Sequence, residues 1–339
     1  PSGTLTRLEG KLRQSGAADQ QQLQVGEVAE GYEWPTVRLG MNCQGGRRRP
    51  GDIHSLAEAA GEACITTDLK VDGYWGESMV TEPGRGRILQ AAHKLSWLHG
   101  QPECWSWSAA LSIPPGGLQG PDREPLGPYR SPSEPNGMGW LNPEQKLKVD
   151  GSTEQMRLTI QVARIVHANN GSVTIEGSPD ARAPGAPGFL TRGGYTSETQ
   201  FPMWAHPEMV EYMGWSGSSI TVRPLCGTRD CPYLAYRALC FNPRARTKSA
   251  QWEALVCCGR KHQALSGWDE QGISHGQRVQ EYSPNMCGII WGIHSLADGA
   301  ESVEPDVKPQ THGVGANQSD QTSETGTKQD TKNSAEPAQ

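Results

Sequence analysis

The stretch EQMRLTIQVARIVHANNGSVTIEGSP, residues 154–179, decides the fold of this chain. Apolar side chains recur through 154–170 as expected for a mostly buried helix, at Met156, Leu158, Ile160, Val162, Ile165 and Val166. Residues 171–179 then read as a short β-branched strand that presents Glu176 before a Gly-Ser-Pro turn. A helix leading directly into such a strand predicts a crossover unit of a doubly wound α/β sheet, where ligands gather at the carboxyl ends of strands.

A second crossover unit is predicted nearer the N-terminus. Residues 36–41 (TVRLGM) suggest a strand, 52–63 a helix capped by Asp52, and 64–69 (CITTDL) another strand. In nucleotide-binding units of this order, glycines let a cofactor approach the backbone and a terminal acid accepts the ribose hydroxyls. The candidate cofactor-binding residues are therefore Gly40, Gly45, Gly46 and Asp68. An ordinary crossover without a cofactor is the alternative, because the chain has no GxGxxG here.

Composition divides the chain into three parts. Residues 1–33 are polar and rich in glutamine, and 299–339 contain no aromatic residue, so we expect both ends to be disordered. The folded domain is then 34–298. Within it, residues 221–262 carry eight arginines and lysines against two acidic residues, which predicts an irregular basic C-terminal lobe that could meet phosphate. A solvated loop without a partner is the alternative for this lobe.

Charge and cysteine usage restrict the class of protein. A formal net charge of -6 argues against a wholly basic nucleic-acid-binding chain. Nine cysteines, an odd number, without a recognisable signal peptide favour free thiols in an intracellular, reducing compartment. No apolar run is long enough for a membrane span, so we expect no membrane partner.

A cluster of potential metal ligands falls within residues 226–262, namely Cys226, Cys231, Cys240, Cys257, Cys258 and His262. Four of them could in principle surround zinc. No pair, however, has the usual two-residue separation, and the thiols of Cys257 and Cys258 are adjacent in sequence. The expectation is therefore buried or idle thiols and no metal site, with zinc as the alternative.

Four motifs resemble, in the same order, those of cytosine-5 DNA methyltransferase-like proteins, most of all divergent versions found in algal and dinoflagellate mobile elements. They are QPECWSWSAA (101–110), VTIEGSP (173–179), RPLCGTR (223–229) and CCGRKHQALSGWDEQGISHGQRVQEYSPNMC (257–287). The resemblance implies a Rossmann-like methyltransferase sheet, S-adenosylmethionine as cofactor and DNA as partner. It implies Cys104 as the nucleophile that adds to carbon 6 of cytosine, Glu176 as the group that holds the base edge, and Arg223 as a contact to base or phosphate.

Three departures from the family pattern keep a second function open. The glycine loop lacks Phe-x-Gly-x-Gly, Glu103 replaces the proline before Cys104, and Gly-Ser follows Glu176 where the family has asparagine. A carboxylate at 103 should disfavour ionisation of the neighbouring thiol, unless a cation such as His99 or an arginine compensates. The alternative to a methyltransferase is therefore a catalytically inactive nucleic-acid-binding or structural protein of a mobile element.

Overall fold

The computed structural model describes residues 37–43, 50–67, 82–108, 128–180, 200–233, 235–263, 270–272, 275, 279 and 282–295. The two ends predicted to be disordered, 1–33 and 299–339, lie outside these residues. All nine cysteines are free thiols, as predicted. Within the described ranges, no helix combines the length and the apolar character needed to cross a bilayer.

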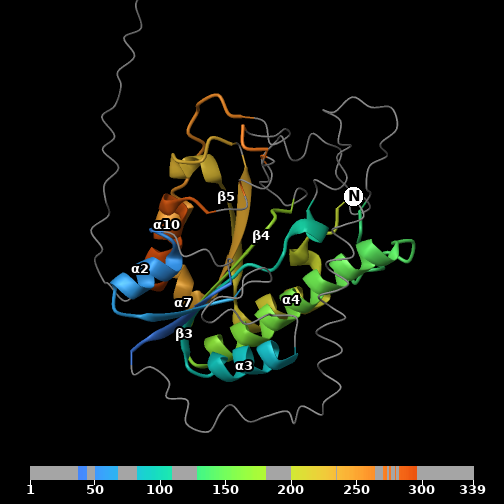
Figure 1. The fold of residues 1–339 in the computed structure, drawn as a ribbon, viewed down its shortest axis with the longest axis horizontal. Coiled ribbons are helices and arrows are strands. Elements are labelled where there is room, and N and C mark those ends of the chain that lie inside the picture. The colour runs from blue at the N-terminus through green and yellow to red at the C-terminus, as the bar shows by residue number, and fades with distance from the viewer. Residues whose placement is uncertain are drawn as a thin grey trace, which may run out of the picture. The chain divides into compact units, whose positions relative to one another are not determined.

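Six strands form one mixed sheet in the order β2-β1-β3-β4-β6-β5 (Figure 1). Their bounds are β1 Leu39–Asn42, β2 Ala63–Thr66, β3 Leu95–Gly100, β4 Ser172–Gly177, β5 Ser219–Pro224 and β6 Tyr236–Phe241. The first four strands are parallel, whereas β6 runs antiparallel to both of its neighbours, β4 and β5. The strand order reverses direction between β1 and β3, which is where open α/β sheets bind ligands, outside the carboxyl ends of the strands.

Helices cover both faces of the sheet, so the predicted doubly wound α/β fold is confirmed. On one face α3 (Glu82–Ala92), α4 (Pro143–Ala168) and α6 (Pro207–Ser216) pack side by side (Figure 1). On the other face α10 (Pro284–His294) contacts α2 (Ile53–Ala59), α7 (Pro243–Arg246) and α8 (Ala250–Glu253). Three short 3₁₀ helices complete the described elements, η1 at Trp105–Trp107, η3 at Met203–Ala205 and η4 at Leu225–Thr228.

Local sequence explains where the two predicted crossover helices begin. The Asp52 side chain accepts a hydrogen bond from the amide of Ser55 and caps α2, as expected. Helix α4 begins at Pro143, well before the predicted start, behind a reciprocal capping box between Asn142 and Gln145. The first turns of α4 escaped prediction because 143–148 are mostly exposed and the next turns bury the polar side chains of Ser152, Thr153 and Gln155, so no apolar spacing marks this part of the helix.

The prediction of an irregular lobe over 221–262 is wrong for much of its length. Most of β5 and all of β6 lie inside this segment and form the antiparallel edge of the main sheet. Buried residues such as Leu239 and Phe241 belong to the core beneath α10. Strand pairing supplies hydrogen-bond partners for the backbone of this part of the segment. The basic residues of 221–262 are distributed over strands, helices and loops and do not form one loop surface.

Trp97 is the centre of the core between the sheet and α10. Its indole ring stacks on His294 with ring centroids 5.2 Å apart, and its Nε1 donates a 3.0 Å hydrogen bond to Glu62, which also pairs with Arg38. The ring lies directly on the backbone of Gly40 in β1, where a Cβ atom would overlap the indole. Only glycine leaves room for this contact.

Gly40→Ala is expected to lower the free energy of unfolding by about 1–3 kcal/mol, because the added methyl forces Trp97 out of its packed position. Gly151→Ala is the matched control, since a Cβ there meets open space in the middle of α4 and should stabilise the protein by about 0.5–1 kcal/mol. Equilibrium unfolding in urea measures both. Equal transition midpoints for the two variants would contradict this account of Gly40.

Candidate functional site

The predicted nucleophile and the predicted base-holding acid meet at the carboxyl edge of the sheet. Cys104 lies in the loop that follows β3, and Glu176 lies near the end of the adjacent strand β4. They are close enough for the Glu176 carboxylate to raise the pKa of the Cys104 thiol. Strand β6 runs in the opposite direction and begins at the same edge, where it places Arg237 beside both residues.

Glu176 and Arg237 form a buried ion pair across β4 and β6. The Arg237 Nε lies 2.9 Å from Glu176 Oε1, and the Glu176 side chain is 0% exposed. The contact has ion-pair distance but not the alignment of a hydrogen bond, and Arg237 Nη2 donates instead to the Val279 carbonyl at 2.7 Å. Burial raises the pKa of Glu176, and the Arg237 charge, with smaller contributions from Gln101 and Tyr282, acts in the opposite direction.

A chain of buried polar side chains leads to this ion pair from the interior of the sheet. His294 accepts or donates hydrogen bonds at Ser172 (3.0 Å) and Thr174 (2.8 Å), and Thr174 in turn contacts His99 Nδ1 at 2.8 Å. The other ring nitrogen of His99 lies 3.0 Å from the Tyr282 hydroxyl. Every step of this chain is within hydrogen-bonding distance, so the side chains of Ser172, Thr174, His99 and His294 all have polar partners.

His99 is neutral and cannot be the cation expected beside Cys104. Burial lowers its pKa to about 3, and burial also lowers the pKa of His294 well below its usual range. The nearby positive charge is instead on Arg237, which lowers the pKa of the Cys104 thiol. Sequence reasoning missed Arg237 because its position depends on the pairing of two strands far apart in the chain.

Burial is the main cause that raises the pKa of Cys104, whose side chain is only partly exposed in the described structure. Arg237 and a hydrogen bond with Ser178 lower this pKa, while Glu176 and Glu103 raise it. Glu103, expected to be the principal obstacle, makes the smallest of these contributions because its side chain points to solvent. The net effect raises the pKa, so the thiol is mostly protonated near neutral pH even with Arg237 beside it.

Helix α4 fixes the loop that carries Cys104. The amide of Glu103 donates a 2.9 Å hydrogen bond to the Gln155 side chain, and the hydroxyl oxygens of Ser106 and Ser152 lie 2.6 Å apart. Both contacts join the segment around Cys104 to a row of buried polar side chains on α4, here called the polar stripe: Ser152, Thr153 and Gln155. The stripe therefore holds the nucleophile in place.

Arg130 completes this anchor and was also missed in the sequence. Its guanidinium is 1% exposed, stacks on Trp107 with its carbon 3.5 Å from the ring centroid, and donates to Ser106, Ser152, Thr153 and the Val149 carbonyl. Burial lowers its pKa to about 9, so the group is charged near neutral pH. A buried arginine with this many partners orders both segments that it joins.

Arg223 lies elsewhere than the resemblance implied. It is opposite Arg237 in the β5–β6 pairing, but its Nε donates to the Glu253 carbonyl at 2.8 Å and its Nη1 to the Val222 carbonyl. The structure thus brings Cys104 and Glu176 together and leaves Arg223 out. Arg237 is the arginine beside Glu176, and the prediction that Arg223 contacts base or phosphate stays a prediction.

The candidate cofactor residues are only partly described. Gly45, Gly46 and Asp68 lie outside the described residues, and Gly40 lies within β1, where packing against Trp97 accounts for it. Within the described residues, two buried polar atoms at strand ends have no nitrogen or oxygen hydrogen-bond partner: Asn42 Oδ1 at the last residue of β1, and Thr67 Oγ1 just after β2, where the Cys43 thiol interacts with it. Buried polar atoms without such a partner are costly, and these two flank the strand ends where a ligand is expected.

A pocket of about 300 Å³ opens next to Tyr282. It is lined by residues that include Leu225, Asp230, Cys231, Tyr233, Tyr282 and Met286. Its volume is at the lower limit for sites that bind small molecules. Because the Tyr282 hydroxyl also contacts His99 and influences Glu176, the wall of the pocket reaches the buried ion pair.

The basic residues of 221–262 divide into two groups. Four have partners within the protein, Arg223, Arg237, Arg246 with Glu253, and Lys248 with the Ser295 carbonyl. The other four, Arg229, Arg244, Arg260 and Lys261, are exposed, as is Arg246 despite its contact with Glu253. These exposed residues remain for contact with phosphate.

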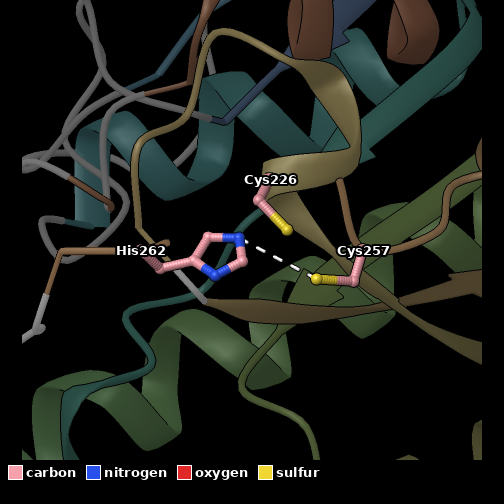
Figure 2. Close-up of side chains that lie close together, drawn as sticks. All are labelled: Cys226, Cys257 and His262. Atoms are coloured by element: carbon pink, nitrogen blue, oxygen red, sulfur yellow. Dashed lines mark hydrogen bonds between the residues drawn. The ribbon is translucent and has the colours of Figure 1, made fainter. Parts of the chain in front are cut away.

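Two of the cysteines in 226–262 that were expected to be buried or idle lie close to a histidine. The ligand atoms of Cys226, Cys257 and His262 all lie within 4.8 Å of one another (Figure 2). The buried Cys226 comes from η4, and the other two come from the segment that follows α8. Their separation in sequence concealed this grouping.

Acid is expected to destabilise the protein below about pH 6.5, because the three buried histidines His99, His206 and His294 all have lowered pKa values. Below this pH the histidines bind protons in the unfolded chain but not in the folded protein, so the free energy of unfolding falls as the pH falls. For His99 the window runs from 6.5 to about 3. His99→Gln should reduce the slope by about 1.4 kcal/mol per pH unit between pH 6 and 4, measured by urea unfolding. An unchanged slope would show that His99 is protonated in the folded protein.

Comparison with known proteins gives this chain no family. No protein-family model matches it, and no curated protein matches it significantly. The resemblance to cytosine-5 DNA methyltransferases therefore stays a prediction from four motifs. The geometry at the carboxyl edge is the basis on which a function can be proposed.

Proposed function

We propose that this chain is an S-adenosylmethionine-dependent DNA cytosine-5 methyltransferase-like protein. One observation carries the proposal: a thiol, a carboxyl group and a guanidinium from three separate segments converge at the carboxyl edge of an α/β sheet, as Cys104, Glu176 and Arg237. The first two are the residues that the motif resemblance names, and residues far apart in a chain do not meet at a ligand-binding edge by local pattern alone.

In this proposal Cys104 and Glu176 act on the two sides of one cytosine ring. Carbon 6 of cytosine is a poor electrophile, so the Cys104 sulfur adds to it while the Glu176 carboxyl hydrogen-bonds the opposite ring nitrogen. Burial raises the pKa of Glu176, so in this proposal the carboxylate of the ion pair takes up a proton when a base binds and can then donate this hydrogen bond. The base must leave the duplex to reach them, at a cost of a few kcal/mol.

Arg237 is proposed as the positioning residue of the pair. It fixes the orientation of the Glu176 carboxyl group through their 2.9 Å contact and lowers the pKa of Cys104 through its charge. The same guanidinium is held from behind by the Val279 carbonyl. One side chain thus favours thiolate formation and aligns the acid.

Asn42 and Thr67 are proposed to help hold the cofactor at the strand ends. The side-chain oxygens of Asn42 and Thr67 lie at the carboxyl ends of β1 and β2, next to the point where the strand order reverses. They would accept or donate hydrogen bonds to the polar groups of bound S-adenosylmethionine. When bound, this cofactor supplies the methyl group that carbon 5 of the activated ring takes.

A second candidate function is a non-catalytic nucleic-acid-binding protein with the same fold. Two observations favour it: Glu176 is fully buried and paired, and burial raises the pKa of the Cys104 thiol. A carboxyl group that cannot reach a base and a thiol that stays protonated would leave only binding. The two functions separate on cofactor binding and covalent chemistry.

The proposal predicts that a duplex containing 5-fluorocytosine traps a covalent adduct on Cys104 in the presence of S-adenosylmethionine, because fluorine cannot leave as the proton does after methyl transfer. Cys104→Ser should abolish the adduct, whereas Cys231→Ser should leave it unchanged. Arg237→Lys should slow trapping about tenfold, a loss of about 1.4 kcal/mol, because the shorter reach of an ammonium group disturbs the 2.9 Å contact with Glu176 and the hydrogen bond to the Val279 carbonyl. Intact-mass spectrometry measures the adduct.

Two controls decide between the candidate functions. Arg223→Met removes an arginine of the same sheet that has no contact with Glu176, and it should trap at the parental rate. Calorimetry with S-adenosylmethionine reports on the cofactor alone. A folded parent protein that shows neither binding heat nor an adduct would eliminate the methyltransferase and leave the non-catalytic function.

Contact with DNA is expected to depend on the exposed basic group near the cysteines. Replacing Arg229, Arg260 and Lys261 together by glutamine should flatten the plot of log affinity against log salt by up to about 0.9 per lost phosphate contact. The double variant Lys146→Gln/Lys148→Gln removes charge from the exposed side of α4 and should keep the parental slope. Fluorescence anisotropy over a salt series measures both. Equal slopes would place the DNA elsewhere or exclude it.

A further inference from the structure

The grouping of Cys226, Cys257 and His262 has the dimensions of a zinc site. Around a tetrahedral zinc ion with bonds of about 2.3 Å to sulfur and about 2.0 Å to nitrogen, a sulfur and a nitrogen ligand lie about 3.5 Å apart. The His262 Nε2 lies 3.8 Å from the Cys257 sulfur and 3.3 Å from the Cys258 sulfur. Both distances bracket the ideal value, and Figure 2 shows the thiol groups of Cys226 and Cys257 directed toward the imidazole ring.

The fold holds the two contributing segments together without help from a metal. Gly227, next to Cys226, lies so close to the segment after α8 that a Cβ atom would come 2.7 Å from the Val256 carbonyl oxygen. Farther along, the Gln263 amide donates a 3.0 Å hydrogen bond to the Pro232 carbonyl. These contacts fix the loop on both sides of the cysteines, so the ligands are arranged before any ion binds.

We propose that Cys226, Cys257, Cys258 and His262 bind one zinc ion. Three sulfurs and one imidazole nitrogen form a closed, four-ligand set of the kind found in structural zinc sites. Cys258 is proposed as the fourth ligand because its sulfur lies 3.3 Å from the imidazole nitrogen; it is outside the group whose ligand atoms all lie within 4.8 Å of one another, so its side chain has to move inward when the ion binds. The ion would join the turn between β5 and β6 to the segment that follows α8. The zinc proposal does not depend on the methyltransferase proposal.

Metal content of the purified protein tests this site. The full chain, prepared with a reducing agent and without chelator, is expected to hold one zinc per chain by elemental mass spectrometry. Cys257→Ser and His262→Ala, at sites with exposed or half-buried side chains, should lose at least about tenfold in zinc affinity. Cys231→Ser is the matched control, because Cys231 is close by but its thiol interacts with the Tyr233 carbonyl, and it should keep the metal.

Cobalt provides a second readout that does not depend on folding of the variants. Replacing zinc by Co²⁺ in the parent protein should give the intense visible bands of tetrahedral cobalt and thiolate-to-metal charge transfer. Both signals should weaken in Cys258→Ser as one sulfur ligand is lost.

Three outcomes would overturn the assignment. They are a folded parent protein that takes up neither zinc nor cobalt, loss of metal in Cys231→Ser, or a Cys226–Cys257 disulfide that persists in reductant. Full retention of metal and cobalt spectrum in Cys258→Ser would overturn Cys258 as the fourth ligand.

Discussion

The buried ion pair between Glu176 and Arg237 is the interaction on which the arrangement of the carboxyl edge depends. Removing one member of such a pair typically costs about 3–5 kcal/mol, because the other charge is left uncompensated in a low-dielectric interior. The pair is possible only if β6 runs antiparallel to β4, since that direction starts β6 at the edge where β4 ends. The reversed strand and the chemistry of the edge are therefore one constraint.

Hydrogen bonds between buried polar side chains hold the residues around this ion pair in place. The hydrogen-bonded chain from Ser172 to Tyr282 runs along the α10 face of β4 and ends next to the ion pair. On the opposite face, Arg130 and the early turns of α4 hold the loop that presents Cys104. Networks of this kind are stabilising only when every member has a partner, so they tend to specify one conformation of the residues they hold.

The β5–β6 hairpin connects both candidate functional regions of the molecule. Its turn carries Cys226 of the proposed zinc site, and its second strand carries Arg237 of the carboxyl edge. The pocket beside Tyr282 lies between them and is also lined by Cys231 from the same turn. A metal that fixed this turn would therefore also restrict the start of β6, which links the order of the cysteine cluster to that of Arg237.

The sequence by itself determined the elements with local signals, such as the Asp52 cap of α2, the strand that ends at Glu176, and the placement of Cys104 after a strand. Periodicity and caps act over a few residues, so they can be seen without the fold. Only the tertiary structure decided that Arg237 lies beside Glu176, and which of the potential ligands in 226–262 lie close together, Cys226 with Cys257 and His262. Those pairings follow from antiparallel register and from packing between distant segments, and neither leaves a periodic trace in the chain.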